Sequence, residues 1–328
     1  MSYIYDLNKL LPGDVILKRT PGENISERVM VATHSDYSHA MLYLGDSSYM
    51  DVGQRVQARN LQRYIIEAPD DTCLLRLNDK YWNGEIICKS IEYARSVVAN
   101  PYSIRDALNI EVGRTSTSTP NTQICTRLVS QAFQYAGLQI VDNIEMCTPQ
   151  EILESKCFII VTDVLREASD FDIRFSKTHD VIEDMVAATD KLITLMADFA
   201  GGELRTIEAI TNYAKTHPED DAKIAGILKE SGYLDVQELD KKYNPHHYDP
   251  AQFIEFYGEN YYHAALQEVD ICLRSVGMYE TELEKYKWIQ SNIGFHSQYL
   301  ELQIDLYNRI IQSYRERTVV GLIVLYRF

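Results

Sequence analysis

The sequence lacks the long hydrophobic segments of membrane proteins. No apolar run approaches the ~20 residues that a transmembrane helix requires. The N-terminal stretch MSYIYDLNKLLPGD has neither the basic start nor the long apolar core of a secretory leader. We therefore expect a cytoplasmic protein with no integral membrane segment, with export by a leaderless route as an open alternative. The final stretch, TVVGLIVLYRF, is β-branched and apolar but short, and it is typical of a terminal strand at residues 318–327.

Positive charge is scarce along the whole chain. Lys and Arg total 32 against 48 Asp and Glu, a formal net charge of −16. Residues 1–165 carry 15 basic and 20 acidic side chains, and residues 166–328 carry 17 and 28. Both halves would repel a polyanion at long range. The charge balance therefore excludes nucleic acid as a partner and disfavours anionic lipid surfaces.

The six cysteines lack the spacing of metal or redox motifs. The sequence contains no CxxC pair and no His/Cys cluster of the kind that binds zinc. We therefore expect reduced thiols, no metal site and no cofactor. Five of the cysteines are interpreted as small buried hydrophobic residues: Cys73, Cys88, Cys147, Cys157 and Cys272.

Chain length and a change in the pattern of apolar residues predict two domains. A chain of 328 residues exceeds the usual size of one compact core, and the pattern changes after residue 165. Residues 1–165 mix short strands with helices, which predicts an α+β domain. Residues 166–328 are predicted to be mainly helical. Helical spacing of apolar residues occurs in five segments: 178–200, 203–216, 219–231, 250–276 and 279–315. The turn-rich NPHHYDP, with His246 and His247, is interpreted as a solvated loop.

Strand signals in the first domain predict an antiparallel sheet. Residues 40–44 and 48–52 flank a Gly-Asp-Ser turn and read as a hairpin. Residues 64–68 and 73–77 are further strand candidates, and the second would close a meander. Helices are expected at 85–98 and 104–109.

A helix is predicted from about Gln123 to Gly137, with Cys125 in its first turn. Apolar residues recur at helical spacing, and Gly137 falls where a left-handed cap would end the helix. The preceding RTSTSTPNTQ is too polar and Pro-rich to extend the helix. The positive end of a helix lowers a thiol pKa, so Cys125 is a candidate nucleophile.

Activation of Cys125 requires a base and a residue that orients the base. On the predicted hairpin, His39 shares one face of the first strand with Met41, and Asp51 shares one face of the second. Any register that joins these faces brings Asp51 close to His39. Oxyanion donors would include the backbone N–H of Cys125, with Tyr37 and Gln123 as side-chain candidates.

The order of these motifs resembles a known family. The series PGD, DYSHAMLYLGD, SYMDVGQRV, NPYS, QICTRLVSQAF and TPQEI is similar to the circularly permuted papain-like hydrolases. It resembles most the YiiX/YebB-like branch of the NlpC-type superfamily, to which the lecithin:retinol acyltransferases are related. The resemblance covers about residues 8–160. It implies a permuted papain-like fold in which Cys125 is the nucleophile, His39 the base and Asp51 the orienting residue, a third position that varies within such families.

Three functions follow as hypotheses. The first is a cysteine hydrolase that cleaves an amide, peptide or isopeptide bond through an acyl-enzyme on Cys125. The second uses the same triad on lipid, as an acyltransferase, thioesterase or phospholipase. The third is a non-catalytic interaction protein whose helical half binds a protein partner.

Overall fold

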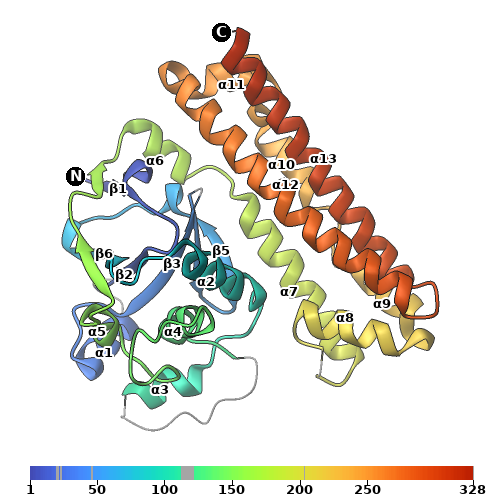
Figure 1. The fold of residues 1–328 in the computed structure, drawn as a ribbon, viewed down its shortest axis with the longest axis horizontal. Coiled ribbons are helices and arrows are strands. Elements are labelled where there is room, and N and C mark those ends of the chain that lie inside the picture. The colour runs from blue at the N-terminus through green and yellow to red at the C-terminus, as the bar shows by residue number, and fades with distance from the viewer. Residues whose placement is uncertain (20–21, 23, 46, 112–121, 203, 328) are drawn as a thin grey trace. The chain divides into compact units, whose positions relative to one another are not determined.

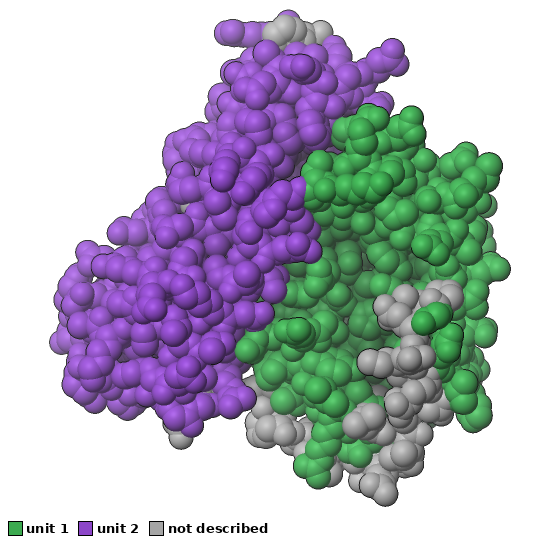
Figure 2. Space-filling view, turned by 180° about the vertical axis from the view of Figure 1, so that it is seen from behind, with its two compact units in different colours: residues 1–178 green, residues 179–328 purple. Residues whose placement is uncertain are grey.

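The computed structural model divides the chain into two compact units, Met1–Thr178 and His179–Phe328 (Figure 2). It describes residues 1–19, 22, 24–45, 47–111, 122–202 and 204–327. Most of the polar segment predicted ahead of Cys125 lies outside the described residues, at 112–121. Among the described residues we find no helix with both the length and the apolarity needed to cross a membrane.

Unit 1 is built on a six-stranded antiparallel sheet with the strand order β5-β4-β3-β2-β6-β7. Its strands are β2 (Val15–Lys18), β3 (His39–Gly45), β4 (Ser48–Val52), β5 (Val56–Asn60), β6 (Thr72–Leu77) and β7 (Phe158–Val161). A second, two-stranded sheet pairs β1 (Tyr3–Tyr5) with β8 (Leu165–Glu167). Together with the helices described next, this confirms the predicted α+β class.

Two details of the predicted sheet are wrong. β6 does not close a meander, because it pairs with β2 on the far side of the hairpin. The strand predicted at residues 64–68 is replaced by β5, eight residues earlier in the chain. After β5 the chain turns through η2 (Leu61–Arg63), where the Asn60 side chain accepts a hydrogen bond from the Gln62 N–H.

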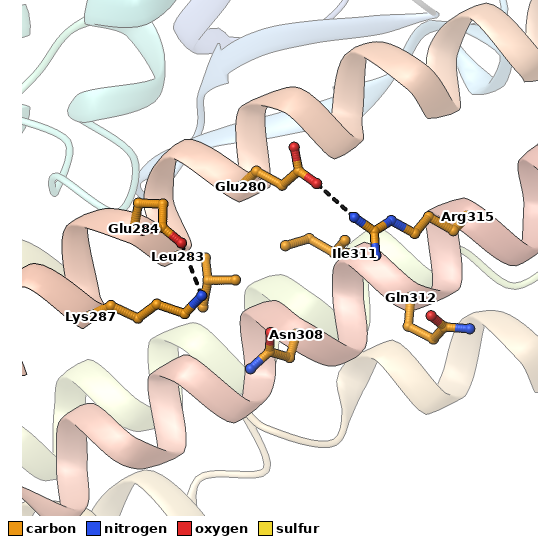
Figure 3. Close-up of a pocket in the computed structure, with 8 residues that line it drawn as sticks. All are labelled: Glu280, Leu283, Glu284, Lys287, Asn308, Ile311, Gln312 and Arg315. Carbon is orange, nitrogen blue, oxygen red and sulfur yellow. Dashed lines mark hydrogen bonds and ion pairs between the residues drawn. The ribbon is translucent and has the colours of Figure 1, made fainter.

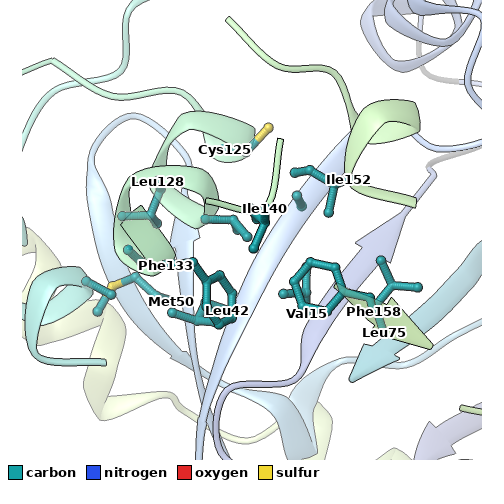
Figure 4. Packing of buried hydrophobic residues seen from close by; sticks show 14 of the residues in the cluster. Val15, Leu42, Met50, Leu75, Cys125, Leu128, Phe133, Ile140, Ile152 and Phe158 are labelled. Atoms are coloured by element: carbon teal, nitrogen blue, oxygen red, sulfur yellow. The ribbon is translucent and has the colours of Figure 1, made fainter. Parts of the chain in front are cut away.

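Unit 1 contains α1 (Asn24–Thr33), α2 (Gly84–Ser96), α3 (Ile104–Glu111), α4 (Cys125–Tyr135), α5 (Pro149–Leu153) and α6 (Asp170–Ser176). Of these helices, α2, α4 and α5 pack on one face of the sheet. Leu128 and Phe133 of α4 belong to one buried cluster with Leu42 and Met50 of the sheet (Figure 4). The helix predicted around Cys125 is confirmed, including the left-handed Gly137 with φ of 88° just past its end.

The opposite face of the sheet carries a second core. Because side chains alternate along a strand, Met41 and Tyr43 point away from α4 and pack with Ile16 and Leu74. The end of unit 1 adds to this structure, since β8 pairs with β1 and Arg63 donates to the backbone oxygens of Phe175 and Thr178. Because of these contacts, unit 1 extends to Thr178. The domain boundary predicted after residue 165 is therefore too early.

Unit 2 is helical. It contains α7 (Val181–Phe199), α8 (Ile207–Thr216), α9 (Asp221–Glu230), α10 (Val236–Tyr243), α11 (Pro250–Tyr257), α12 (Tyr261–Asn292) and α13 (Gln298–Arg327). The long helices α12 and α13 run side by side in opposite directions (Figure 1). The predicted break near residue 277 is absent, because α12 continues through it.

The terminal strand predicted at residues 318–327 is also wrong, because this segment forms the last turns of α13. Val320 and Val324, four residues apart, are buried against Ala265 and Phe253. Gly321 permits this approach, since a Cβ there would lie 2.7 Å from Val269 Cγ2. Helix packing has therefore overridden the β-propensity of these β-branched residues.

A buried ion pair joins α12 to α13. Arg317 Nε donates to Glu268 Oε1 at 2.7 Å, and both side chains are largely buried. Burial alone would raise the pKa of Glu268, but the Arg317 charge and hydrogen bond bring it below its usual value. Arg317 Nη1 also lies 3.6 Å from Asp240 Oδ2, so the guanidinium is the partner of two acidic side chains, and its loss would leave the buried Glu268 charge without a cation.

The segment with His246 and His247 is folded against this helix pair. Both belong to η5 (Pro245–His247), where His246 is buried and its ring stacks on Phe256 at 3.7 Å between ring centres. Burial and the adjacent His247 lower the pKa of His246 to about 3. The solvated loop predicted here is wrong, because Phe256 supplies an apolar surface for the neutral imidazole.

The ion pair yields a prediction for stability. Replacing Arg317→Met strands the Glu268 charge in the interior and should lower the free energy of unfolding by about 3–5 kcal/mol. Replacing both residues, Arg317→Met with Glu268→Leu, removes the stranded Glu268 charge and should recover most of the loss, because Asp240 keeps His247 and Tyr248 as partners. Urea unfolding of the full chain, followed by circular dichroism, measures both. A double variant as unstable as the single one would show that the ion pair is not the cause.

Candidate active site

The backbone just before Cys125 is anchored to unit 1 by hydrogen bonds. The Gln123 N–H donates to the Pro101 carbonyl at 2.9 Å, and the Ser103 N–H donates to the Gln123 carbonyl at 2.8 Å. Tyr102 and Gln123 thereby form a short parallel bridge. This bridge holds the entry to α4, and so the first residue of the helix, in one place.

A second anchor holds the first turn of α4. Arg127 Nη2 donates to Asp106 Oδ2 of α3 at 2.9 Å, and each side chain is only 1% exposed. Arg127 Nε also donates to the Glu145 backbone oxygen at 2.9 Å. A buried guanidinium with these partners has little freedom to move. Cys125, two residues earlier, is therefore held on a rigid helix start.

The N-terminus of α4 suits an anion. The residue that caps the helix is Ile124, whose side chain has no oxygen to accept hydrogen bonds from the first-turn N–H groups. The partial positive charge at the start of α4 can therefore stabilise a negative charge on or beside the Cys125 sulfur. In Figure 4 the sulfur of Cys125 projects from this end of the helix.

His39 and Asp51 meet as the hairpin geometry predicts. His39 is the first residue of β3, and the pairing of Leu42 with Met50 places Asp51 one diagonal step from it on β4. His39 Nε2 lies 2.6 Å from Asp51 Oδ1. The predicted proximity of the imidazole and the carboxylate is confirmed, while their catalytic roles stay predictions.

Cys125 completes the group. The His39 imidazole and the Ala40 backbone N–H lie near enough to the Cys125 thiol to lower its pKa, and the thiol in turn raises the pKa of His39. Cys125 and His39 are each the first residue of their element, so the start of α4 meets the start of β3. The structure thus brings together three residues that the sequence spreads over more than 80 positions.

The charges of the three residues are coupled. Burial raises the pKa of the Cys125 thiol, but the His39 charge and the hydrogen bonds from His39 and Ala40 bring it below its usual value. Burial lowers the pKa of His39, but Cys125 and Asp51 together raise it above its usual value. These opposite shifts favour a thiolate beside an imidazolium.

The two side chains predicted as oxyanion donors have other neighbours. Gln123 is buried, and its Nε2 donates to Gln131 Oε1 at 2.7 Å. Tyr37 lies with its hydroxyl beside the Cys73 thiol, and burial with that neighbour raises the pKa of Tyr37 to about 12. Their role in binding an oxyanion stays a prediction.

One residue of the group was missed from the sequence. Arg59 Nε on β5 lies 3.2 Å from Asp51 Oδ2. β5 was not recognised, although Val56 and Ala58 alternate with the polar Gln57 and Arg59 in the pattern of a strand with one buried face. That alternation is the signal that would have found Arg59.

Unit 2 has a groove of a different character, between α12 and α13 (Figure 3). Its volume is about 560 Å³, and Leu283 and Ile311 supply its apolar part. Glu280 and Arg315 pair across it at 2.7 Å. Its described lining contains neither cysteine nor histidine, so it offers neither a thiol nor an imidazole. Within the described part of the chain, no three His, Cys, Asp or Glu side chains gather closely enough to bind a metal ion.

Comparisons with known proteins are sparse. No family model matches the chain, and no curated protein matches it. Among solved structures, the chain is similar to the metalloprotein YiiX of Escherichia coli O157:H7, with 17% sequence identity and a TM-score of 0.36. The likeness covers 46% of this chain and 95% of YiiX. A likeness this weak identifies neither shared residues nor a shared activity.

The lowered thiol pKa yields a prediction for reactivity. Cys88 is exposed on α2, so its interpretation as a buried residue is wrong, and it provides a reference thiol. Iodoacetamide should alkylate Cys125 with a pH midpoint below that of Cys88, because the thiolate is the reactive form. His39→Gln removes the positive partner, so burial should then raise the midpoint above that of Cys88. Mass spectrometry of the two cysteine peptides between pH 5 and 10 measures both rates. Equal midpoints for Cys125 and Cys88 in the wild type would contradict the ion pair.

Proposed function

We propose that this protein is a cysteine hydrolase that cleaves an amide, peptide or isopeptide bond through an acyl-enzyme on Cys125. The observation that carries the proposal is the position of the His39 ring, whose Nε2 lies 2.6 Å from Asp51 Oδ1 and whose pKa is raised by the nearby Cys125 thiol. Nucleophile, base and orienting residue in contact are the parts that covalent acyl transfer requires. The permuted papain-like assignment of unit 1 is part of this proposal.

The first half of the reaction forms the acyl-enzyme. The Cys125 thiolate attacks the substrate carbonyl carbon, a C–S bond forms, and the carbonyl π electrons move to oxygen. The first-turn N–H groups of α4 face this developing oxyanion. The His39 imidazolium donates its proton to the amine nitrogen, the C–N bond breaks and the amine leaves.

The second half releases the acid. Neutral His39 takes a proton from a water molecule as the water oxygen attacks the thioester carbonyl. The C–S bond then breaks, so that the thiolate is restored beside a protonated His39. Throughout, Asp51 keeps the imidazole in one orientation and stabilises its positive charge.

This mechanism predicts which substitutions abolish acylation. Cys125→Ala and His39→Gln should each lower the rate of acyl-enzyme formation by about a thousandfold or more, and Asp51→Asn by about a hundredfold or more. The substrates are a peptide library, acyl thioesters and acylated lipids, each tested with the full chain. Intact-mass spectrometry detects the acyl adduct. Cys88→Ala, which removes an exposed thiol on α2, is the matched control and should acylate normally.

The substrate panel also separates the alternatives. Turnover of peptides or other amides supports the proposal, whereas transfer or hydrolysis of lipid acyl groups alone would favour the lipid enzyme. Failure of the wild type to form an adduct with any of the three substrate classes would favour the non-catalytic interaction protein.

A further inference from the structure

Arg59 occupies the far side of the Asp51 carboxylate from His39. His39 Nε2 lies 2.6 Å from Asp51 Oδ1, and Arg59 Nε lies 3.2 Å from Asp51 Oδ2. Both oxygens of the carboxylate therefore have a partner. A carboxylate held at both ends cannot rotate about its bond to Cβ without breaking one of these contacts.

Strand pairing places Arg59 there. On the β4–β5 ladder, Asp51 is opposite Gln57 and Tyr49 is opposite Arg59. Arg59 is thus the diagonal neighbour of Asp51 on the same face of the sheet. His39 is the diagonal neighbour on β3. Three adjacent strands thus supply one imidazole, one carboxylate and one guanidinium in a row.

The surroundings hold the guanidinium in place. With the Gln57 amide turned so that its oxygen faces Arg59, this oxygen accepts from Arg59 Nη2 and lies 3.0 Å from Arg59 Nε. Gln57 is itself buried. A Cβ on Gly53 would lie 3.3 Å from the Gln57 amide and 4.0 Å from Arg59 Nη2, so the glycine leaves room for both side chains.

We propose that Arg59 is a positioning residue of this active site, which holds the Asp51 carboxylate so that Oδ1 faces the His39 ring. The inference rests on the proposed function and adds a fourth residue to it. A guanidinium suits this role because its planar set of N–H donors can bind the Asp51 and Gln57 oxygens together. An ammonium group is a point charge with no fixed direction.

The ion pair between Arg59 and Asp51 itself contributes little to the free energy of unfolding. The Arg59 side chain is 37% exposed, and exposed pairs are screened by water. The effect should therefore be seen in the reaction and in the charge state of Cys125. Loss of Arg59 removes a positive charge and frees the Asp51 carboxylate to turn, and both changes destabilise the thiolate and imidazolium pair.

The test compares Arg59→Gln, Arg59→Lys and a charge control. Arg59→Gln should lower the acylation rate constant about 10- to 100-fold with little change in KM, because a misplaced base slows the chemical step and not substrate binding. The pH midpoint of Cys125 alkylation should also rise. Arg59→Lys keeps the charge, so it should return this midpoint towards the wild-type value while restoring only part of the acylation rate.

Lys18 provides the charge control. It is a second cation that acts on the Asp51 charge, and its ammonium lies 4.9 Å from the centre of the Tyr64 ring. If orientation by Arg59 is the main effect, Lys18→Gln should change the acylation rate far less than Arg59→Gln does. Equal losses in the two variants would overturn the positioning role in favour of general electrostatics.

Three further outcomes would overturn the proposal. Arg59→Gln with wild-type acylation and an unmoved alkylation profile would remove Arg59 from the site while leaving the hydrolase intact. A lower free energy of unfolding with an unmoved alkylation profile would assign Arg59 a structural role only. A wild-type Cys125 that neither acylates nor shows a lowered alkylation midpoint would instead overturn the proposed function, and the role of Arg59 with it.

Discussion

The placement of the Asp51 carboxylate and the Cys125 thiol beside one imidazole, that of His39, is the constraint on which the site depends. A thiol and a carboxylate that both act on one ring must be held within a fraction of an ångström of their working positions. Unit 1 meets this requirement by placing each group at the rigid start or interior of a regular element: Cys125 at the first turn of α4, His39 at the start of β3 and Asp51 within β4. Loops alone would not achieve this precision.

The contacts that anchor α4 restrict which residues can occupy these positions, because they place charged side chains in the interior. The Arg127–Asp106 pair is buried almost completely, and a bridge at Gln123 fixes the backbone on the other side of Cys125. A buried pair contributes little net stability, but it strongly penalises arrangements in which either charge is alone. Unit 2 also buries an ion pair between helices, where Arg317 of α13 meets Glu268 of α12. In both units, an arrangement that separates the pair would leave a charge buried alone.

Local patterns predicted the parts of the site that are built from neighbouring residues. The start of α4 followed from helical periodicity and the polar entry, and the approach of His39 to Asp51 followed from the alternation along one hairpin. Arg59 was missed because β5 was not recognised as a strand; its alternation would have indicated the strand, but its pairing with β4 depends on contacts that no local pattern records. The pairing of β6 with β2 was missed for the same reason.

The sequence by itself determined the α+β class, the helical character of the second half and the candidate nucleophile, because periodicity and helix ends are properties of short segments. Only the tertiary structure decided that the β-branched residues near the C-terminus are helical. It likewise decided that His246 is buried and stacks on Phe256. It also decided which carboxylate oxygen faces His39 and which faces Arg59. Burial and long-range pairing set these outcomes, and both arise between segments that are distant in the chain.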